Sequence, residues 1–485
     1  MDKDDAEISQ VEEAERDKHE QKSAADLETD GKDWTPAEER SLVKQIDWHL
    51  LPMLCVIMGL SLLDRVNISA AYVAGMKTDL DMETPGARYS ISLLLFFVTY
   101  AIFELPSNLL IRRFGARYWL TGLIIGWGAV IIGMGFIHSW VVMAVLRLLL
   151  GAFEAGLLPG AIFLLSAWYT KFEMARRITI FYMSSLVTNA FGGIFAYALS
   201  KISVGSGVYS QGWRWIYIVE GLATVLAGFI AFFTLGEFPE HSRWLSDRQR
   251  HIALKRVALE AGGEEYEHVN VKQAFRMLLD WKVGAFCLMY YISASSVYSV
   301  SYFTPVILSG ALGYDQSTTL LLTSPPWVFC IIVSIIMAFI SDRYRTRWPL
   351  ILITVSSIVG LLIVLYAPPP GVRLFGLFLA TYGAQSNVIS NLSYAENNTS
   401  HPSKKGVITA AMITIGAAGG ITGSTIFRSQ DAPKYIPGMW ATLGFQFLYI
   451  GVLALMTFHF KRKNRLLREG KIGPIDGLRG FQYVP

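Results

Sequence analysis

Charged side chains are scarce in this sequence. Asp, Glu, Lys and Arg together make up 16% of the 485 residues, whereas a soluble domain usually carries about 25%. A soluble chain of this length needs a polar shell, and the stretch from Trp48 to Phe460 has almost none. The scarcity of charge therefore argues against a soluble globular protein and predicts a chain embedded in a lipid bilayer.

Other features are missing as well. The three cysteines lie in apolar runs, which predicts free thiols with neither a disulfide framework nor a metal site. The net charge of +4 is too small and too dispersed to favour a nucleic-acid partner. The sequence has no Walker loop, no nucleophile elbow and no cluster of metal ligands. We therefore expect no ATP drive, no enzymatic activity and no cofactor.

Long apolar runs fill most of the chain. A spanning helix needs roughly 20 mostly apolar residues. Six such runs precede a polar stretch at 237–281, and six follow it, which predicts two six-helix bundles (46–236 and 282–460) joined by a cytoplasmic linker. The predicted spans lie near 49–73, 89–111, 118–138, 140–167, 178–200, 214–236, 283–311, 318–340, 349–367, 372–396, 406–427 and 438–460.

The two ends of the chain are polar. Residues 1–45 are crowded with Asp, Glu and Lys, so we expect a disordered tail and no signal peptide. Within this range, Thr35-Pro36-Ala37-Glu38 matches a capping box and predicts a short amphipathic helix that leads into the first span. Residues 461–485 form the second predicted tail, and the linker is expected to hold surface helices along the inner leaflet.

Basic residues predict the orientation. They are concentrated in the loops on one side of the membrane, and the positive-inside rule places that side in the cytoplasm. Because the number of spans is even, both termini are then cytoplasmic. We expect a multi-pass protein of the cell membrane, with an internal membrane such as the vacuole as an alternative. The basic loop residues are Arg112, Arg113, Arg117, Lys171, Arg176, Arg177, Arg343, Arg345, Arg347, Lys404 and Lys405.

A few charges lie inside the predicted spans, where each costs about 2.5–3.5 kcal/mol on insertion scales. Arg147 and Glu154 are seven residues apart and so share one face of the fourth span. An arginine keeps its charge, whereas a buried carboxylate can take a proton, and together they could couple protons to an anion. The alternative is a set of structural ion pairs. The charges are Asp64, Arg65, Glu104, Arg147, Glu154 and Glu220.

Neutral polar residues mark the second half. Asn387 and Asn391 share a face of the tenth span, and Tyr298 lies with Tyr291 and Tyr302 along roughly one face of the seventh. Amides and phenols that line a cavity suit hydrogen bonding to hydroxyl or carboxylate groups. Interhelical hydrogen bonds and aromatic packing explain the same pattern equally well.

These motifs resemble the major facilitator superfamily and, within it, the anion:cation symporters. The first-span motif is Leu63-Asp64-Arg65-Val66-Asn67-Ile68, and the fourth-span motif runs from Arg147 through Gly151 and Glu154 to Pro159-Gly160. Ala395-Glu396-Asn397-Asn398-Thr399 is similar to the end of the tenth span in the fungal allantoate-permease branch. The resemblance covers 44–460 and implies an all-α fold with 12 transmembrane helices in two six-helix bundles.

The resemblance also implies roles for particular residues. Asp64 and Glu154 match the proton sites of bacterial sugar-acid symporters, Arg65 matches the residue that binds the substrate carboxylate, and Tyr100 matches a substrate contact. Glu104 stands where those relatives have a glutamine, which adds a possible third protonatable group. Glu104 and Arg147 are the expected charge network, and Asn387, Asn391 and Tyr298 are the expected further substrate contacts.

The prediction is thus a monomeric secondary transporter that couples protons to a small organic anion, a carboxylate or vitamin-like acid, by alternating access. Two alternatives stay open at this point: a nutrient sensor that binds without translocation, and an exporter of an acidic metabolite. A membrane-embedded enzyme is disfavoured because no catalytic constellation is seen.

Overall fold

The computed structural model describes residues 33–82, 87–204, 210–242, 244–260, 276–344, 349–399, 402–432, 434–473 and 482–484. Within these ranges the secondary structure is helical throughout, with no strand. Residues 1–32 of the predicted tail, residue 243 and 261–275 of the linker, and 474–481 lie outside the described residues.

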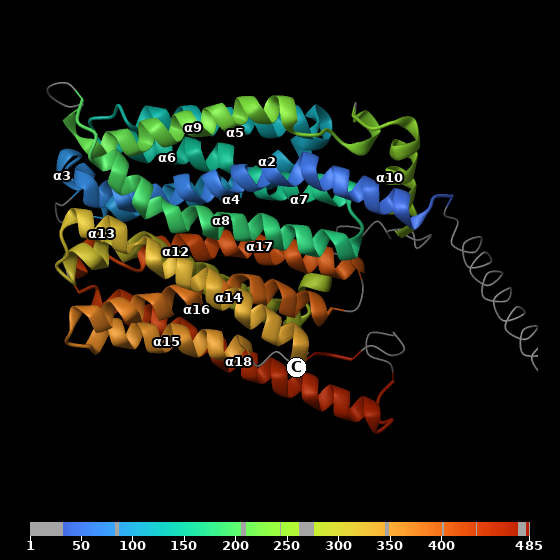
Figure 1. Ribbon diagram of the computed structural model, residues 1–485. Coiled ribbons are helices and arrows are strands. Elements are labelled where there is room, and N and C mark those ends of the chain that lie inside the picture. The colour runs from blue at the N-terminus through green and yellow to red at the C-terminus, as the bar shows by residue number, and fades with distance from the viewer. Residues whose placement is uncertain are drawn as a thin grey trace, which may run out of the picture.

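The first six spans form one bundle, called the N-bundle here (Figure 1). The fourth span is divided, because α6 ends at Glu154 and α7 begins at Leu157. The first span continues from α2 through a short π-helical turn, η1, into α3. The helices are α2 (Pro36–Ala71), η1 (Tyr72–Met76), α3 (Lys77–Asp79), α4 (Arg88–Phe114), α5 (Ala116–Met134), α6 (Trp140–Glu154), α7 (Leu157–Trp168), α8 (Lys171–Ser200) and α9 (Gly212–Thr234).

The last six spans form the C-bundle, which lies beside the N-bundle (Figure 1). Here the second span is divided into α13 and α14. The helices are α12 (Trp281–Gly310), α13 (Gln316–Leu322), α14 (Ser324–Tyr344), α15 (Pro349–Tyr366), α16 (Pro370–Asn397), α17 (Pro402–Thr425), η4 (Ser429–Asp431) and α18 (Ile436–Arg468). The two bundles meet chiefly where α4 packs on α17 and where α8 packs on α14.

The expected all-α fold of 12 spans in two bundles is confirmed. By length and apolar composition, nine helices of the described chain can cross a membrane. The bent helix α4 makes a tenth: it turns by 51° where Pro106 interrupts it. Helix α15 supplies a shorter apolar rod, 351–366. Helix α16, which carries the amides noted above, is not among the helices that are apolar enough by this measure.

The linker forms η3 (Pro239–His241) and α10 (Asp247–Glu260). Helix α10 runs across the end of the N-bundle where α2 begins (Figure 1). We call this the near end of the molecule and the opposite end, where α3 and α13 lie, the far end. Ion pairs hold α10 in place: Arg256 contacts Glu173 of α8 at 3.0 Å and Glu39 of α2 at 3.6 Å.

One predicted boundary is wrong, the end of the disordered first tail at 45. The predicted capping box is confirmed, since the Thr35 hydroxyl accepts from the Glu38 N–H at 3.2 Å and Glu38 accepts from the Thr35 N–H at 2.8 Å. It starts α2 at Pro36, so 36–45 are helical rather than disordered and lead without a break into the first span. Helix α18 continues past the last predicted span to Arg468, where basic residues complement the helix dipole.

Residues 482–484 return to the near end of the C-bundle. The Asn464 side chain donates to the Tyr483 carbonyl at 2.7 Å and accepts from the Tyr483 N–H at 3.0 Å. The Asn398 side chain does the same with Val484, at 3.1 and 2.8 Å. The Tyr483 ring stacks on Phe460 at 4.3 Å. We call these contacts the tail clamp, and they tie α16 and α18 together.

Candidate functional site

Arg65 of α2 lies at the centre of the predicted site. Its Nη2 and Nε atoms donate to Oε1 of Glu154, the last residue of α6, at 2.6 and 3.1 Å. Ser61, one turn earlier on α2, donates to the same oxygen. Both ends of the pair are buried, with relative exposures of 8% for Arg65 and 1% for Glu154. The second oxygen of Glu154, Oε2, has no hydrogen-bond partner in the described part of the chain.

The same guanidinium connects the two bundles. Arg65 Nη1 donates to the Tyr298 hydroxyl on α12 at 2.7 Å. The Phe96 and Tyr100 rings of α4 each lie 5.0 Å from the guanidinium carbon, which is cation–π distance. The structure therefore brings together four predicted site residues, namely Arg65, Glu154, Tyr100 and Tyr298. It also adds Ser61 and Phe96, which the sequence analysis did not single out.

A glycine allows this meeting of helices. A Cβ atom at Gly151 would collide with the Phe96 carbonyl oxygen, so only glycine lets α6 approach α4 so closely. Gly151 lies one turn before Glu154 in the fourth-span motif. Its small size therefore positions both Glu154 and the aromatic ring that covers Arg65.

Asp64 points away from Arg65, into the interior of the N-bundle. Its Oδ2 atom accepts from Trp127 Nε1 on α5 at 3.2 Å and from Thr224 Oγ1 on α9 at 2.9 Å. Consecutive residues of a helix point about 100° apart, so neighbouring charges face different neighbours. Its Oδ1 atom has no partner among the described residues. The neutral donors Trp127 and Thr224 carry no sequence signal and were missed.

Arg147 is fully buried at 0% exposure. Its Nη1 atom donates to the Arg65 carbonyl at 3.4 Å, and its Nε and Nη2 atoms have no partner in the described structure. Glu154 hydrogen-bonds Arg65 in this conformation, so the shared helix face of Arg147 and Glu154 does not make them an ion pair here. Glu104, one turn from Tyr100 on α4, is 6% exposed and leaves its Oε2 atom unpartnered within the described ranges.

The amides of α16 lie within the C-bundle. Asn387 exchanges hydrogen bonds with Thr354 of α15 at 3.3 and 3.4 Å. Asn391 donates to Ser293 of α12 at 3.4 Å. These are interhelical contacts, the alternative that the sequence left open, and the structure does not join either amide to Arg65. Their role in substrate binding stays a prediction.

A small cavity of about 40 Å³ lies between the bundles. Such a volume holds a few water molecules. Asn67 and Asn189 line it from the N-bundle, and Ser301, Thr304 and Thr381 line it from the C-bundle. The Nδ2 atom of Asn67 is buried and has no partner among the described residues. The lining is uncharged and mixes these polar side chains with apolar ones such as Val300 and Trp327. Asn67 lies two residues from Arg65.

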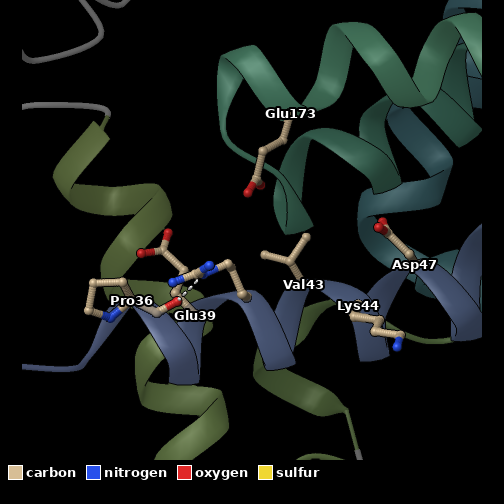
Figure 2. Close-up of a pocket in the computed structure, with 7 residues that line it drawn as sticks. Pro36, Glu39, Val43, Lys44, Asp47 and Glu173 are labelled. Atoms are coloured by element: carbon tan, nitrogen blue, oxygen red, sulfur yellow. Dashed lines mark hydrogen bonds between the residues drawn. The ribbon is translucent and has the colours of Figure 1, made fainter.

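A larger hollow of about 410 Å³ opens at the near end, lined from α2 and α8 (Figure 2). Three carboxylates surround it, but their charges are matched. Asp47 accepts both arms of Arg177, at 2.7 and 2.8 Å. Glu173 and Glu39 contact Arg256. This hollow is a junction between α2, α8 and α10, and its carboxylates hold helices together.

A comparison with families of known proteins identifies the class of protein to which this chain belongs. The sequence profile of the Major Facilitator Superfamily matches residues 54–424. The chain belongs to the major facilitator superfamily. The match includes the first-span motif around Arg65 and the fourth-span motif around Glu154.

Curated relatives of this major facilitator are transporters. The chain is 32% identical to the MFS transporter prlL of Fungal sp. (strain NRRL 50135), with 92% of this chain and 91% of the relative covered. It is 30% identical to the MFS-type transporter efuF of Hormonema carpetanum, with 91% of each chain covered. It is therefore a multi-pass membrane transporter, and the names of these relatives give no substrate.

Solved structures support the fold of this major facilitator. A bacterial homolog of the human lysosomal transporter Spinster, in an inward-facing and unoccupied conformation, superposes with a TM-score of 0.66 at 15% identity, covering 88% of this chain and 98% of that one. A D-xylose-proton symporter superposes with a TM-score of 0.61 at 16% identity, covering 82% and 95%. At these identities the likeness concerns the fold alone.

Proposed function

We propose that this transporter couples the movement of protons to that of a small organic anion, as expected of the anion:cation symporters. The observation that carries the proposal is the buried pair of Arg65 and Glu154. A guanidinium keeps its charge at any working pH and binds a carboxylate through two parallel hydrogen bonds. It is therefore a ready-made anion site at the boundary between the bundles.

Glu154 occupies that site in the present conformation. A substrate carboxylate would have to compete with Glu154 for the Nε and Nη2 atoms of Arg65. Protonation of Glu154 removes its negative charge and frees these two donors. Proton and anion then load together, and loss of the proton returns Glu154 to Arg65 and expels the anion. This competition is a physical reason for symport.

Tyr298 connects the site on the N-bundle to the C-bundle. Among the described side chains of the C-bundle, that of Tyr298 hydrogen-bonds Arg65. Its ring centre lies 4.6 Å from that of Phe97 on α4. An anion on Arg65 would lie beside this hydroxyl, and Tyr100 would cover it from α4. Rocking of one bundle against the other about such a site is alternating access.

Aromatic side chains join the bundles at the far end. Phe303 of α12 lies 5.9 Å from Tyr89 of α4, and it stacks on Phe427 at 4.7 Å. Ser90 donates to the Phe427 carbonyl at 3.4 Å. With the basic near end in the cytoplasm by the positive-inside rule, these contacts would close the outer side. Substrate would then leave toward the cytoplasm from this conformation.

Transport by purified protein in liposomes tests the proposal. Labelled small carboxylic acids are offered under an inward proton gradient, with and without a protonophore, and counterflow is measured in the same vesicles. Proton-driven accumulation of an organic anion that the protonophore abolishes is the expected result. Accumulation unchanged by the protonophore overturns the coupling, and binding without counterflow indicates a sensor. Reversed gradients test whether the cargo is exported.

A further inference from the structure

A second group of buried charges lies inside the N-bundle, away from Arg65. Glu220 of α9 is 5% exposed, and neither of its carboxyl oxygens has a hydrogen-bond partner among the described residues. Thr224, one turn later on the same face of α9, donates to Asp64. Glu220 therefore lies within electrostatic range of Asp64. The neighbouring Arg147 has two unpartnered guanidinium nitrogens in the described structure.

The surrounding helices are tightly packed. A Cβ atom at Gly128 of α5 would lie 3.2 Å from the Gly221 carbonyl oxygen of α9, next to Glu220. A Cβ atom at Gly221 would lie 2.7 Å from the Ile132 backbone nitrogen. The α5–α9 interface beside Glu220 therefore leaves little space for water that could solvate an ionised carboxylate.

Charge balance decides which carboxyl groups are neutral. Two buried arginines of the N-bundle, Arg177 and Arg214, pair with Asp47 and Asp79, each at 2.7 Å. The other buried charges of the described N-bundle are two arginines, Arg65 and Arg147, and four carboxyl groups, those of Asp64, Glu104, Glu154 and Glu220. An uncompensated buried charge is strongly unfavourable. Two guanidinium groups can compensate two carboxylates, so four ionised carboxyl groups would leave two without compensation. Glu154 accepts from Arg65, and Asp64 accepts two hydrogen bonds, whereas Glu220 accepts none among the described residues.

Glu220 is therefore the carboxyl group whose surroundings favour the neutral form most. The titratable groups that interact electrostatically with Glu220 are Asp64 from α2 and Tyr217 from α9 itself, and Arg147 from α6 interacts in turn with both of these. Helix α5 contributes the neutral Trp127. Arg147 therefore favours a negative charge on one of the two carboxyl groups, but not on both.

We propose that Glu220 and Asp64 form a carboxyl pair that carries one transported proton, which Glu220 holds in this conformation. Neither oxygen of Glu220 is hydrogen-bonded to Asp64 in this conformation, so for transfer the Glu220 side chain first turns toward the unpartnered Oδ1 atom of Asp64. The Glu220 O–H bond then breaks as an O–H bond forms on the Asp64 carboxylate, and the negative charge moves to Glu220. Arg147, beside Asp64, is a positive charge available to the pair. Transport of this proton rests on the proposed function, whereas the protonation of Glu220 does not.

Infrared spectroscopy of the full-length protein in lipid tests the protonation without any substrate. A protonated carboxyl group has a C=O stretching band that a carboxylate lacks. Glu220→Gln should remove one such band at neutral pH, and Glu220→Asp should shift it. Asp247→Asn, on the exposed α10 surface, is the control and should leave the bands unchanged. A full set of bands in folded Glu220→Gln overturns the proposal whatever the protein transports.

Proton stoichiometry tests the transport step. If the pair carries one proton, Glu220→Gln should lower the steady-state accumulation of substrate about tenfold at a gradient of about one pH unit and zero membrane potential, because each coupled proton contributes a factor of ten. Wild-type accumulation in a Glu220→Gln protein that has lost the band overturns the proposal, since Glu220 would then hold a structural proton. Absence of proton-driven transport in the wild type would instead refute the proposed function.

Discussion

The two bundles share a fold but differ in the chemistry of their interiors. In the described chain, every buried Asp, Glu, Lys or Arg belongs to the N-bundle or to α10, and the buried polar residues of the C-bundle are Ser, Thr, Asn and Gln. The N-bundle can therefore hold and exchange charge, whereas the C-bundle can offer only neutral hydrogen bonds. The hydrogen bond from Arg65 to Tyr298 joins the two.

The difference suggests a division of labour. Proton and anion binding would occur on the N-bundle, and the C-bundle would respond through Tyr298 and the polar wall of the central cavity. Substitutions of the buried charges of the N-bundle should therefore change coupling or abolish transport. Substitutions of C-bundle amides should mainly change affinity or stability.

The largest expected effect is that of Arg65→Lys. Lysine keeps the positive charge but loses the planar fork that contacts Glu154 twice and Tyr298 once, so uptake should fall by roughly a hundredfold or more. The measurement is uptake per folded protein in liposomes. The exposed Arg248→Lys on α10 is the control. Near-normal affinity in Arg65→Lys would move the anion site elsewhere, with Arg147 as the next candidate.

A smaller effect is expected from the C-bundle side of the same contact. Tyr298→Phe removes the hydroxyl that accepts from Arg65 and keeps the ring against Phe97. The lost hydrogen bond to a charged group corresponds to about 1.5–3 kcal/mol, so substrate affinity should change by roughly tenfold or more while proton coupling persists. Titration of substrate-induced fluorescence measures it. Loss of coupling with unchanged affinity would contradict the division between the bundles.

The tail clamp should affect stability rather than transport. Asn464→Ala removes two hydrogen bonds to the Tyr483 backbone and leaves buried polar groups unsatisfied, which costs about 1–3 kcal/mol. Thermal unfolding should therefore begin at a lower temperature, with substrate affinity unchanged. Asn398→Ala, which removes the equivalent pair of bonds to Val484, is the matched variant. A large change in transport with unchanged stability would contradict this prediction, because the tail clamp would then have a role in transport.

The smallest expected effect is a pH dependence at the near end of the C-bundle. Partial burial opposes ionisation of Asp280, but hydrogen bonds from the Lys282 N–H and from Lys404 hold its pKa below the ordinary value. This stabilisation is present above the unfolded pKa of about 3.9 and is lost as pH falls through the lower folded pKa. Asp280→Asn should flatten the acid side of the stability profile. An unchanged profile would exclude Asp280 as a contributor.

The sequence predicted the fold more fully than it predicted the contacts between side chains. Apolar runs and a polar linker are local signals, and they were sufficient for twelve spans in two bundles. The capping box at Thr35 was also local, but the acidic composition around it concealed that α2 continues without a break. The predicted end of the last span at 460 follows hydropathy, which marks where a membrane segment stops, whereas helical hydrogen bonding carries α18 on to Arg468.

The candidate site was predicted in its parts and not in its pairing. Arg65 and Glu154 are 89 residues apart, and nothing local shows that they meet. Helical spacing put Arg147 and Glu154 on one face, but α6 ends at Glu154, and Gly151 lets that end approach α4 closely. The donors to Asp64 are a tryptophan and a threonine, residue types that are common in any apolar helix.

The central claim, that protonation of Glu154 frees Arg65 for the anion, is tested most directly by Glu154→Gln. The amide resembles the protonated acid in shape and neutrality. The variant should bind substrate and exchange labelled for unlabelled substrate across the membrane, but it should not accumulate substrate under a proton gradient. Counterflow and driven uptake are measured in the same vesicles and normalised to folded protein. A well-folded Glu154→Gln that still accumulates substrate up to the wild-type level would contradict the account.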